Sequence, residues 1–495
     1  MPSLWLDTRT AAPAPSDGLV PGAAYDVVVV GAGLTGLSTA LLLARQGRRV
    51  AVLEARTVGA VTSGNTTGKV SLLQGSVLSG IRRHVGPEAV AAYVAANREG
   101  QAWLVERLGQ GEVLQRRDAF TYAVTQQGQH RLAGETAACR EAGLAVEEIA
   151  GGDAGLPFPV RAAIRLPDQA QMHPIRLLDG VVAELRRLGG VVVEGTRMTG
   201  LRSADPCRVR TSAGEVKAGH VVLATGTPVL DRGLHFAQLE ALRSYALAYR
   251  VPGDLPAGMY LSVDRATRSL RTAPVDGQEL LVVGGNGHGV GRQRAPRTLV
   301  AALDGWARES FAGAELTHRW SAQDYRSFDH MPIIGPMPGT GDRVLVATGF
   351  NKWGMAGGVA AALALSGRIV GVEPTWAPAL GGRVPGPRRT LELARVNAVV
   401  GAQLASGWAA AEFRATAGQP PTERAGEVGR DGVTPMAVST VGGTTRRVSA
   451  ICTHLGGVLR WNDAECSWDC PLHGSRFAAD GTVLEGPATR DLPRR

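Results

Sequence analysis

The chain has 495 residues, of which 44% are hydrophobic and 20% charged, a composition typical of a globular protein of roughly three domains. Its formal net charge is +9, but only three of its cations are lysines and the arginines are spread along the whole sequence, so we expect no nucleic-acid binding. No apolar stretch approaches the roughly 20 residues of a membrane span, and the N-terminus lacks the pattern of a signal peptide, so we expect a cytoplasmic protein without a membrane span.

The strongest local pattern lies between residues 25 and 54. The β-branched run Val27 to Val30 predicts a buried parallel strand. Three glycines follow it in the spacing G-x-G-x-x-G: Gly31, Gly33 and Gly36. They allow a tight turn and a close approach of the backbone to a pyrophosphate, and the helix predicted from about Leu34 directs its amide-rich end at the phosphates. A second strand ends at Glu54, where an acid can bind a ribose hydroxyl, so the pattern predicts a dinucleotide site without choosing between NAD and FAD.

A loop rich in Gly, Ser and Thr follows Glu54, and we expect it to cross over the bound dinucleotide. Its candidate cofactor contacts are Thr66, Thr67 and Lys69. The alternative is an ordinary solvated loop. Beyond it, residues 87–150 are predicted to be mostly helical.

Two later segments have the composition of cofactor-facing turns. A strand pair at 208–217 leads into the apolar run 221–224, which is followed by Thr225 and Gly226. The strand predicted at 344–347 precedes a glycine-rich turn and an alanine-rich helix, which would present a second helix N-terminus to the cofactor. The candidate cofactor contacts in this second segment are Gly349, Gly354 and Met355.

These separated motifs together resemble the FAD-dependent D-amino-acid oxidase superfamily, which includes glycine oxidase and sarcosine oxidase. The matches are GAGLTG with Glu54, the internal LATG, and the late MPIIG followed by VLVATGFNKWGM, across about residues 25–375. The resemblance implies FAD and an α/β fold, in which a Rossmann-like FAD-binding domain is interleaved with an α+β substrate domain whose sheet covers the flavin. The loop at 65–69 and the region near Met331 contain no cysteine, and threonines occupy the loop where a linking histidine could stand, so we predict non-covalent FAD.

The predicted domains follow from this resemblance. The FAD-binding domain comprises 22–75, 150–235 and 328–375, and the substrate domain comprises 76–149 and 236–327. A linker with a helix over 391–413 spans 376–424. The remaining residues, 425–495, form short strands broken by glycine, which indicates a small all-β domain.

That last segment carries a second cofactor motif. Cys452-x-His454 is followed further along the segment by Cys470-x-x-His473, a mixed set of thiolates and imidazoles for which zinc is the alternative metal. The flanks CTHLGG and CPLHGS closely resemble the Rieske iron-sulfur domain. The resemblance implies a [2Fe-2S] cluster in which the two cysteines bind one iron and the two histidines bind the other. Cys466 does not fit the ligand spacing.

Departures from the high-potential Rieske type, found in respiratory and photosynthetic complexes, predict a low potential. Gly457 and Leu472 occupy the positions at which that type has a disulfide, and Phe477 replaces a tyrosine that bonds a ligand sulfur; Ser475 remains as a hydroxyl donor. Fewer donors to the cluster stabilise its reduced form less, so we expect the lower part of the range from about −150 to +300 mV.

Two cofactors of unlike electron count imply a redox enzyme. The superfamily resemblance implies oxidation of a small amine or amino acid, with electrons leaving singly through the cluster to a ferredoxin-like acceptor; direct transfer to O2 stays open. In one alternative a partner reduces the cluster, and reduced flavin then acts on a substrate or on oxygen. A second alternative is an electron-transfer module without its own substrate. A Rieske oxygenase is not expected, because the histidines outside the motif form no pair with a nearby acid.

Three residues are candidates for the catalytic site. His288 ends a predicted strand in a glycine run, and His330 precedes the MPIIG motif. Lys352 is a lone lysine in the late turn of a chain that otherwise uses arginine, which suggests a role for a compact ammonium near the flavin. The alternatives are a turn histidine for His288 and chance placement for Lys352.

Overall fold

The structure is a computed structural model that describes residues 2–10, 16–109, 111, 113–230, 232–381, 387–412, 419–432 and 434–494. The chain divides into two compact units. The first contains 1–226, 244–287 and 303–384, and the second contains 227–243, 288–302 and 385–495. The boundaries of these units differ from those of the predicted FAD-binding and substrate domains, which stay predictions.

A mostly parallel sheet forms one layer of the first unit, with strand order β16-β17-β10-β1-β2-β7. Its strands are β1 (Ala24–Val30), β2 (Val50–Leu53), β7 (Val191–Val193), β10 (Gly214–Leu223), β16 (Ile333–Pro336) and β17 (Val344–Thr348). The strands β8 (Met198–Arg202) and β9 (Cys207–Thr211) extend it from β10. The valines of β1 are buried as predicted, because strands on both sides and helices on the faces exclude water from them.

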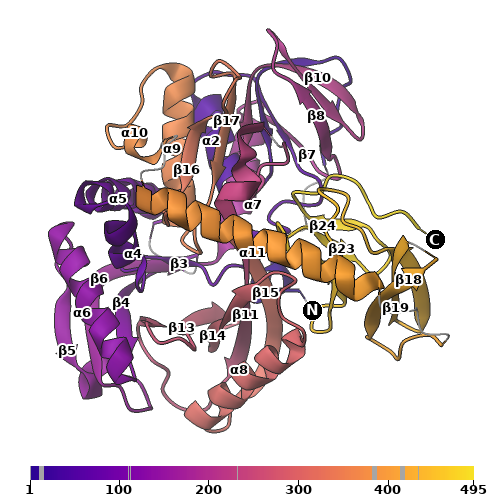
Figure 1. Ribbon diagram of the computed structural model, residues 1–495. Helices are drawn as coiled ribbons and strands as arrows, with labels where there is room; N and C mark the ends of the chain where they lie inside the picture. Colours follow the sequence, from indigo (N-terminus) through magenta and orange to yellow (C-terminus); the bar gives the residue numbers. More distant parts are fainter. Residues whose placement is uncertain are drawn as a thin grey trace. The chain divides into compact units, whose positions relative to one another are not determined.

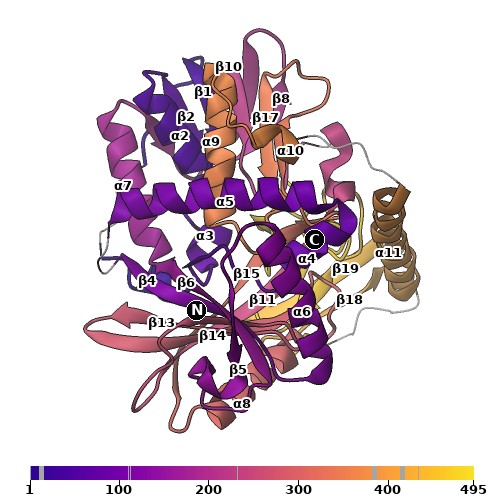
Figure 2. The ribbon, with the colours of Figure 1, turned by 90° about the vertical axis from the view of Figure 1, so that its left-hand side faces the viewer.

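Helices α2 (Leu34–Arg45) and α9 (Ala356–Val370) pack together on this sheet, and α5 (Pro87–Leu108) runs across α9 (Figure 2). The contact between α5 and α9 is close because Gly100 has no side chain: a Cβ there would lie 2.1 Å from the carbonyl oxygen of Ala356. The helix predicted from about Leu34 and the strand that ends before Glu54 are confirmed.

The second large sheet has the strand order β15-β11-β14-β13-β12-β4-β6-β3, with β5 paired to β6 (Figure 1). Its strands are β3 (Lys69–Val70), β4 (Leu114–Ala123), β5 (Glu147–Ala150), β6 (Ala162–Met172), β11 (Leu239–Arg250), β12 (Met259–Ser262), β13 (Arg268–Val275), β14 (Gln278–Gly289) and β15 (Glu315–Ser327). Helix α6 (Gln126–Glu141) packs on β4 and β6 of this sheet and on α4 (Val77–His84), and α8 (Pro296–Ser310) lies between β14 and β15 in the sequence. Helix α7 (Pro174–Arg187) packs instead on α2 and β7 of the first sheet.

The prediction that residues 87–150 are mostly helical is wrong over β4 and β5. The sequence of β4 does not alternate between apolar and polar residues, because three consecutive charged residues, Arg116 to Asp118, occupy the first half of the strand. Its register against β6 also shifts between Arg117 and Ala119, which breaks the alternation of its two faces.

The buried side chain of Glu135 on α6 predicts an unusual pH dependence of stability. Its oxygens accept the N–H groups of Leu78 (3.1 Å) and Ser79 (2.8 Å) in the first turn of α4, and burial raises the pKa of Glu135 to about 7. The unfolded chain loses this proton near pH 4.3, so the stabilisation is complete below about pH 4 and is lost as the pH rises to 7, at a cost of about 3 kcal/mol. We therefore expect the urea midpoint of the native chain to fall between pH 5 and pH 8, and this fall to be smaller in Glu135→Gln, which has no proton to lose; because the amide offers one acceptor oxygen for two N–H groups, its midpoint should be lower than that of the native chain at pH 5.

The matched control for this test is Glu141→Gln, because Glu141 lies on the same helix but is partly exposed and pairs with Arg82. Its urea midpoint should follow that of the native chain at both pH values. An equal fall in midpoint from pH 5 to pH 8 in Glu135→Gln and the native chain would contradict the prediction.

The second unit contains the helix α11 (Pro387–Glu412) and two small antiparallel sheets. One sheet comprises β18 (Gly426–Asp431), β19 (Thr434–Val441) and β20 (Thr444–Ser449); the other comprises β21 (Arg460–Asn462), β22 (Ser467–Asp469), β23 (Arg476–Ala478) and β24 (Val483–Glu485). Trp468 and Phe477 are fully buried in their core. The predicted fold class, mixed α/β with a small all-β region, is confirmed; Phe413, the predicted end of the long helix, lies outside the described residues.

A buried ionic cluster joins an early segment of the chain to the small sheets of this unit. Arg476 pairs with Asp469 (3.0 Å), Glu485 (2.7 Å) and Glu465 (2.5 Å). Arg243, at the start of β11 and only 3% exposed, pairs with the same Glu465 (2.6 Å) and Glu485 (3.3 Å). Two cations therefore share three carboxylates away from water, an arrangement in which each charge depends on its partners.

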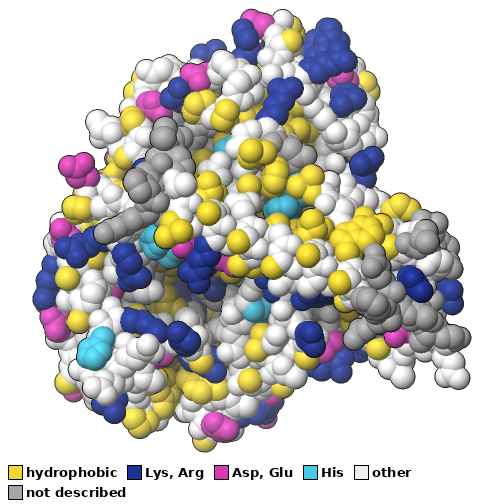
Figure 3. All heavy atoms as spheres, in the orientation of Figure 1, with side chains coloured by type: hydrophobic (Ala, Val, Ile, Leu, Met, Phe, Trp, Pro, Cys, Tyr) yellow, Lys and Arg dark blue, Asp and Glu magenta, His cyan; other side chains and the backbone are white. Residues whose placement is uncertain are grey.

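Within the part of the chain that the structure describes, none of the helices combines the length and the apolar character that crossing a bilayer requires. On the face shown in Figure 3, Lys and Arg side chains lie at several separate places, as the dispersed arginines of the sequence predict.

Candidate functional site

The first part of the candidate site, in the first unit, is the glycine turn between β1 and α2. Gly31 has φ = +106°, and a Cβ there would lie 2.5 Å from the carbonyl oxygen of Ala224. A Cβ on Gly36 would lie 2.0 Å from the carbonyl oxygen of Gly31. Gly33 caps α2 without a side-chain hydrogen bond. The backbone segments of the turn therefore pack so closely that side chains are excluded at Gly31 and Gly36, and a pyrophosphate-binding turn requires this close packing.

Glu54 holds this turn in place. Its two carboxylate oxygens accept the N–H groups of Ala32 (2.9 Å) and Arg56 (2.8 Å). Burial raises the pKa of Glu54, although both of these hydrogen bonds oppose the shift. Glu54 thus ties the end of β2 to the glycine turn, and its contact with a ribose stays a prediction.

Side chains from distant elements hold the loop at 65–68 by its carbonyl groups. The indoles of Trp320 and Trp5 donate to the carbonyl oxygens of Asn65 (2.8 Å) and Thr66 (2.6 Å). The buried guanidinium of Arg271 donates to those of Thr67 (2.8 Å) and Gly68 (3.2 Å). The loop is therefore a fixed structural element and not a solvated one, while cofactor contacts from Thr66 and Thr67 stay predictions.

Lys69 is buried at the end of this loop. Its Nζ donates to the carbonyl oxygen of Tyr260 (2.5 Å) and to Oγ of Ser269 (2.8 Å), and burial brings its pKa well below the usual value for lysine. These bonds join Lys69 to β12 and β13, so it links the loop to the second large sheet.

The internal LATG motif and the late glycine turn meet the first motif. The carbonyl oxygen of Gly226 accepts a hydrogen bond from Oγ1 of Thr348 (2.5 Å). At the helix ends, a Cβ on Gly358 in α9 would lie only 2.7 Å from Oγ1 of Thr35 in α2. Gly349 has φ = +78°, and Met355 caps α9 near Gly354. Three motifs that lie far apart in the sequence thus converge, with the N-termini of two helices side by side.

Two charged groups lie at the late turn. Lys352 is exposed with φ = +72°, and its N–H donates to Oδ2 of Asp324 on β15. Burial raises the pKa of Asp324 to about 6 against the opposing effect of the Lys352 charge. The neighbouring Tyr325 accepts the N–H of Asn351 at its carbonyl oxygen (2.9 Å), which fixes β15 against the turn. Asp324 was not among the residues predicted from the sequence, because its only local signal is an acid in the middle of a strand.

The three candidates for catalysis have different surroundings. His330 has φ = +67° and stacks on His84 of α4 with 4.7 Å between ring centroids, and burial lowers its pKa to about 4. His288 belongs to the second unit, where its Nδ1 lies 2.9 Å from the carbonyl oxygen of Gly289. Lys352 lies in the glycine-rich turn before α9, and a catalytic role for each of the three stays a prediction.

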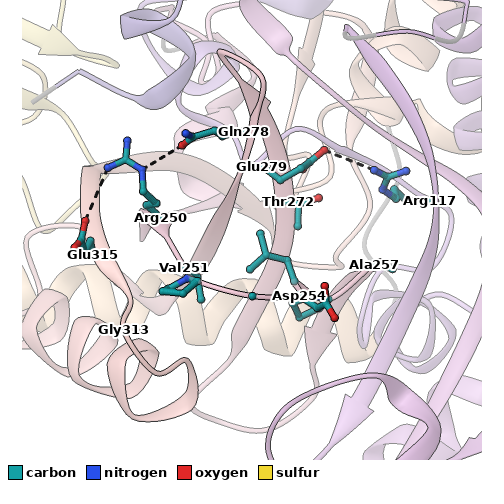
Figure 4. A pocket seen from close by; sticks show the side chains of 14 residues that line it. Arg117, Arg250, Val251, Asp254, Ala257, Thr272, Gln278, Glu279, Gly313 and Glu315 are labelled. Carbon is teal, nitrogen blue, oxygen red and sulfur yellow. Dashed lines mark hydrogen bonds and ion pairs between the residues drawn. The ribbon is translucent and has the colours of Figure 1, made fainter.

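A cavity of about 820 Å³ opens on the second sheet of the first unit, away from these motifs in sequence (Figure 4). Strands β4, β11, β13, β14 and β15 and the segment 251–257 line it. Four of the charged side chains that line it form two ion pairs, Arg250 with Glu315 (3.9 Å) and Arg117 with Glu279 (3.8 Å), and Asp254 also lines it. None of the predicted site residues lines this cavity.

The Rieske motif, in the second unit, consists of two loops with matching backbone bonds. In the first, the N–H of Cys452 donates to Gly457 O (2.9 Å) and the N–H of Gly456 donates back to Cys452 O (3.1 Å). In the second, the N–H of Cys470 donates to Ser475 O (2.8 Å) and the N–H of Gly474 donates back to Cys470 O (3.1 Å). Each loop thus presents its cysteine and its histidine from the same framework.

The four side chains sort into two pairs. Cys452 and Cys470 are buried and hydrogen-bonded to each other, and the rings of His454 and His473 lie 5.2 Å apart by centroids. Paired thiols beside paired imidazoles fit the donor set of a [2Fe-2S] cluster whose two irons have different ligands. Cys466, by contrast, is partly exposed on a turn with φ = +56°.

The surroundings of the cysteines agree with the sequence-based expectations. The hydroxyl of Ser475 hydrogen-bonds Cys452 and accepts the N–H of Ala488 (3.0 Å). A Cβ on Gly457 would lie 2.6 Å from Leu472, so the two positions that hold a disulfide in the high-potential type are adjacent here and filled by a leucine side chain. The low potential stays a prediction.

Comparisons with known proteins agree with both halves of this description. The DAO family, described as FAD dependent oxidoreductase, matches residues 26–368, and the Rieske [2Fe-2S] domain matches residues 417–494. The protein YhfW of Bacillus subtilis, which carries the name of a Rieske 2Fe-2S iron-sulfur protein, is 30% identical over 94% of this chain and 92% of its own length.

Two further comparisons concern the separate parts. The cytochrome b6-f complex iron-sulfur subunit of Synechococcus sp. (strain JA-3-3Ab) is 53% identical over 45 residues, which are 9% of this chain and 26% of that one. The fold resembles the crystal structure of glycine oxidase from Geobacillus kaustophilus with a TM-score of 0.61 and 20% identity, over 74% of this chain and 100% of that one. The chain belongs to the family of FAD-dependent oxidoreductases and carries a C-terminal Rieske [2Fe-2S] domain.

Proposed function

We propose that the protein oxidises a small amine or amino acid and passes the electrons singly through its Rieske centre to an external one-electron acceptor of the ferredoxin class. The observation that carries the proposal is the convergence of the three glycine-containing motifs in the fold of an amino-acid-oxidising flavoprotein, in a chain that also holds a one-electron centre. The matched glycine oxidase is covered over its whole length, so its complete fold has a counterpart in this chain, which supports the proposal.

The chemistry divides between the two groups that the chain holds. Bound FAD would supply hydride acceptance. The substrate loses two electrons and two protons as its C–N bond becomes C=N, and water then hydrolyses the imine to a carbonyl compound and to ammonia, or to an amine where the nitrogen carries a second carbon. Two acceptor molecules each take one electron. The protein must therefore bind the amine, orient its C–H bond and accept a proton.

Asp324 and Lys352 are the groups we assign to these tasks. Asp324 offers a carboxylate to a substrate ammonium, because its pKa near 6 leaves it ionised at neutral pH while its partial burial strengthens the attraction. Lys352 has an exposed side chain, but burial of its ammonium lowers the pKa of this group while the charge of Asp324 opposes that shift. The ammonium can hold a substrate carboxylate or the anionic edge of a flavin. A zwitterionic amino acid would thus meet one partner for each of its charges.

The test is anaerobic mixing of the purified protein with small amines and amino acids, glycine among them, while the visible spectra of both centres are followed. We expect the flavin to bleach first and the cluster to be reduced afterwards. An enzyme that runs electrons inward would instead be inert to every amine and would be reduced by ferredoxin-like donors, and that result would overturn the proposal.

A substitution connects this test to the site. Asp324→Asn should lower the rate of flavin bleaching at subsaturating amine roughly ten-fold or more, because a hydrogen bond to a charged group contributes about 1.5–3 kcal/mol. In the native protein this rate should rise with pH through about 6 as Asp324 ionises. In the variant the rate should not rise with pH in this range. Asp342→Asn is the control, because Asp342 is exposed and pairs with Arg368 on the surface.

A further inference from the structure

The histidine side of the Rieske centre is covered by a residue from the flavoprotein part of the sequence. The ring of Phe236 lies edge-on to both imidazoles, with centroid distances of 5.3 Å to His454 and 4.9 Å to His473 and interplanar angles of 83° and 74°. All three residues belong to the second unit. One aromatic ring therefore contacts both histidines. These two imidazoles form the polar side of the centre, which we call the histidine edge.

Hydrogen bonds on either side of Phe236 fix its backbone. Nδ2 of Asn397, on α11, donates to the carbonyl oxygen of Ala237 (3.0 Å). The side chain of Gln238 closes the preceding turn by donating to Gly233 O (3.2 Å). Further along, Glu240 pairs with Arg292 (2.9 Å). The ring is thus carried by a segment that is tied down at several points.

Both ligand loops are packed against chain from outside the matched Rieske residues 417–494. On the second loop, Nε of Arg292 donates to Pro471 O (3.1 Å), and Gly291 lies so close that a Cβ would be 2.7 Å from Pro471 N. On the first loop, the indole of Trp408 on α11 donates to Gly456 O (3.2 Å). Phe236 is therefore one of several residues from outside the Rieske match that pack against the two ligand loops.

We propose that Phe236 is a positioning residue that closes the histidine edge of the Rieske centre to water and to external redox molecules. Electrons from the flavin then enter this edge through Phe236 and the segment that carries it, which begins directly after Gly226 of the internal motif. This inference rests on the proposed function for the direction of electron flow, but the closure itself does not depend on it.

The closure has an electrostatic consequence. A [2Fe-2S]²⁺ core with two thiolates and two neutral imidazoles has no net charge, and one added electron makes it an anion. An apolar ring in place of water at the histidine edge stabilises that anion less, so Phe236 holds the reduction potential down. Removal of the ring should admit water and shift the potential to a more positive value.

The experiment uses the full-length holoprotein and the variant Phe236→Ala. We expect a more positive cluster potential and a several-fold faster oxidation of the dithionite-reduced cluster by ferricyanide, with the EPR signal retained. Phe236→Leu, which keeps an apolar side chain, should give intermediate values of both and serves where the alanine variant fails to assemble. Phe120→Ala, which removes a ring stacked on Tyr260 in the first unit, should leave both unchanged.

Two results separate this inference from the proposed function. An unchanged potential and an unchanged ferricyanide rate in a folded Phe236 variant would overturn the closure, whatever amines do to the flavin. Slower reduction of the cluster by substrate in Phe236→Ala than in the native protein, at an unchanged rate of flavin bleaching, would support the electron route through Phe236. Rates of both steps equal to those of the native protein would overturn this route. The dithionite and ferricyanide measurements need no amine, so they decide the closure even if no amine is oxidised.

Discussion

Cys470→Ser should yield a protein that retains FAD and has no Rieske EPR signal. Cys470 is 2% exposed, its thiol is hydrogen-bonded to that of Cys452, and its backbone is fixed by Ser475 and Gly474. A serine oxygen there would replace one of the two cysteine ligands of an iron. We expect a complete loss of bound iron and sulfide, measured chemically and by EPR, with the flavin spectrum unchanged because the flavin motifs lie in the first unit.

The chain supplies its own matched control for this prediction. Cys466 lies shortly before Cys470 in the sequence, is only partly buried and sits on a turn outside the pair of ligand loops. Cys466→Ser should therefore keep the full iron and sulfide content and the EPR signal. A variant Cys470→Ser that retained the signal, or a Cys466→Ser protein that lost it, would refute the ligand assignment.

The second large effect is expected for Gly36→Ala. A Cβ at this position of α2 would lie 2.0 Å from the carbonyl oxygen of Gly31, and this backbone cannot move away without opening the glycine turn. We expect a protein purified without flavin, or one whose FAD content is reduced at least ten-fold, because the turn that receives the pyrophosphate can no longer close. FAD released on denaturation, measured by fluorescence, quantifies the effect.

Gly180→Ala is the control for this second prediction. Gly180 also lies inside a helix, α7, but its Cβ would meet no atom within 4 Å. Alanine there should leave the FAD content unchanged and raise the thermal midpoint slightly, because alanine is favoured over glycine in a helix interior by up to about 1 kcal/mol. Equal FAD content in the Gly36 and Gly180 variants would refute the role of Gly36.

The features that could be predicted from the sequence are those encoded in short windows. The glycine turn needs a run of valines, three glycines and an acid, and all of them lie between Val27 and Glu54. The two ligand loops likewise need four residues, all between Cys452 and His473. In each case local geometry and chemistry demand particular residue types at fixed spacing, so the amino-acid order alone is enough to identify them.

The features that escaped prediction depend on partners brought from far along the chain. Asp324 matters because Lys352, in a later structural segment, donates to it, and β4 was missed because charged residues and a register shift conceal its alternation. Phe236 belongs to no sequence pattern: its role follows only from its contact with two histidines near the other end of the chain. His288 was predicted as a catalytic candidate because it ends a strand in a glycine run, but in the structure it belongs to the second unit.

The shared carboxylates of Arg243 impose an order on biosynthesis. Arg243 leaves the ribosome long before Glu465 and Glu485 are translated, yet it is buried with them in the finished protein. Until the last segment emerges, this guanidinium has to stay hydrated, and the start of β11 cannot reach its final environment. The carboxy-terminal module thus completes the folding of a segment made much earlier, and a chain truncated before residue 465 would expose an orphaned charge to quality-control proteases.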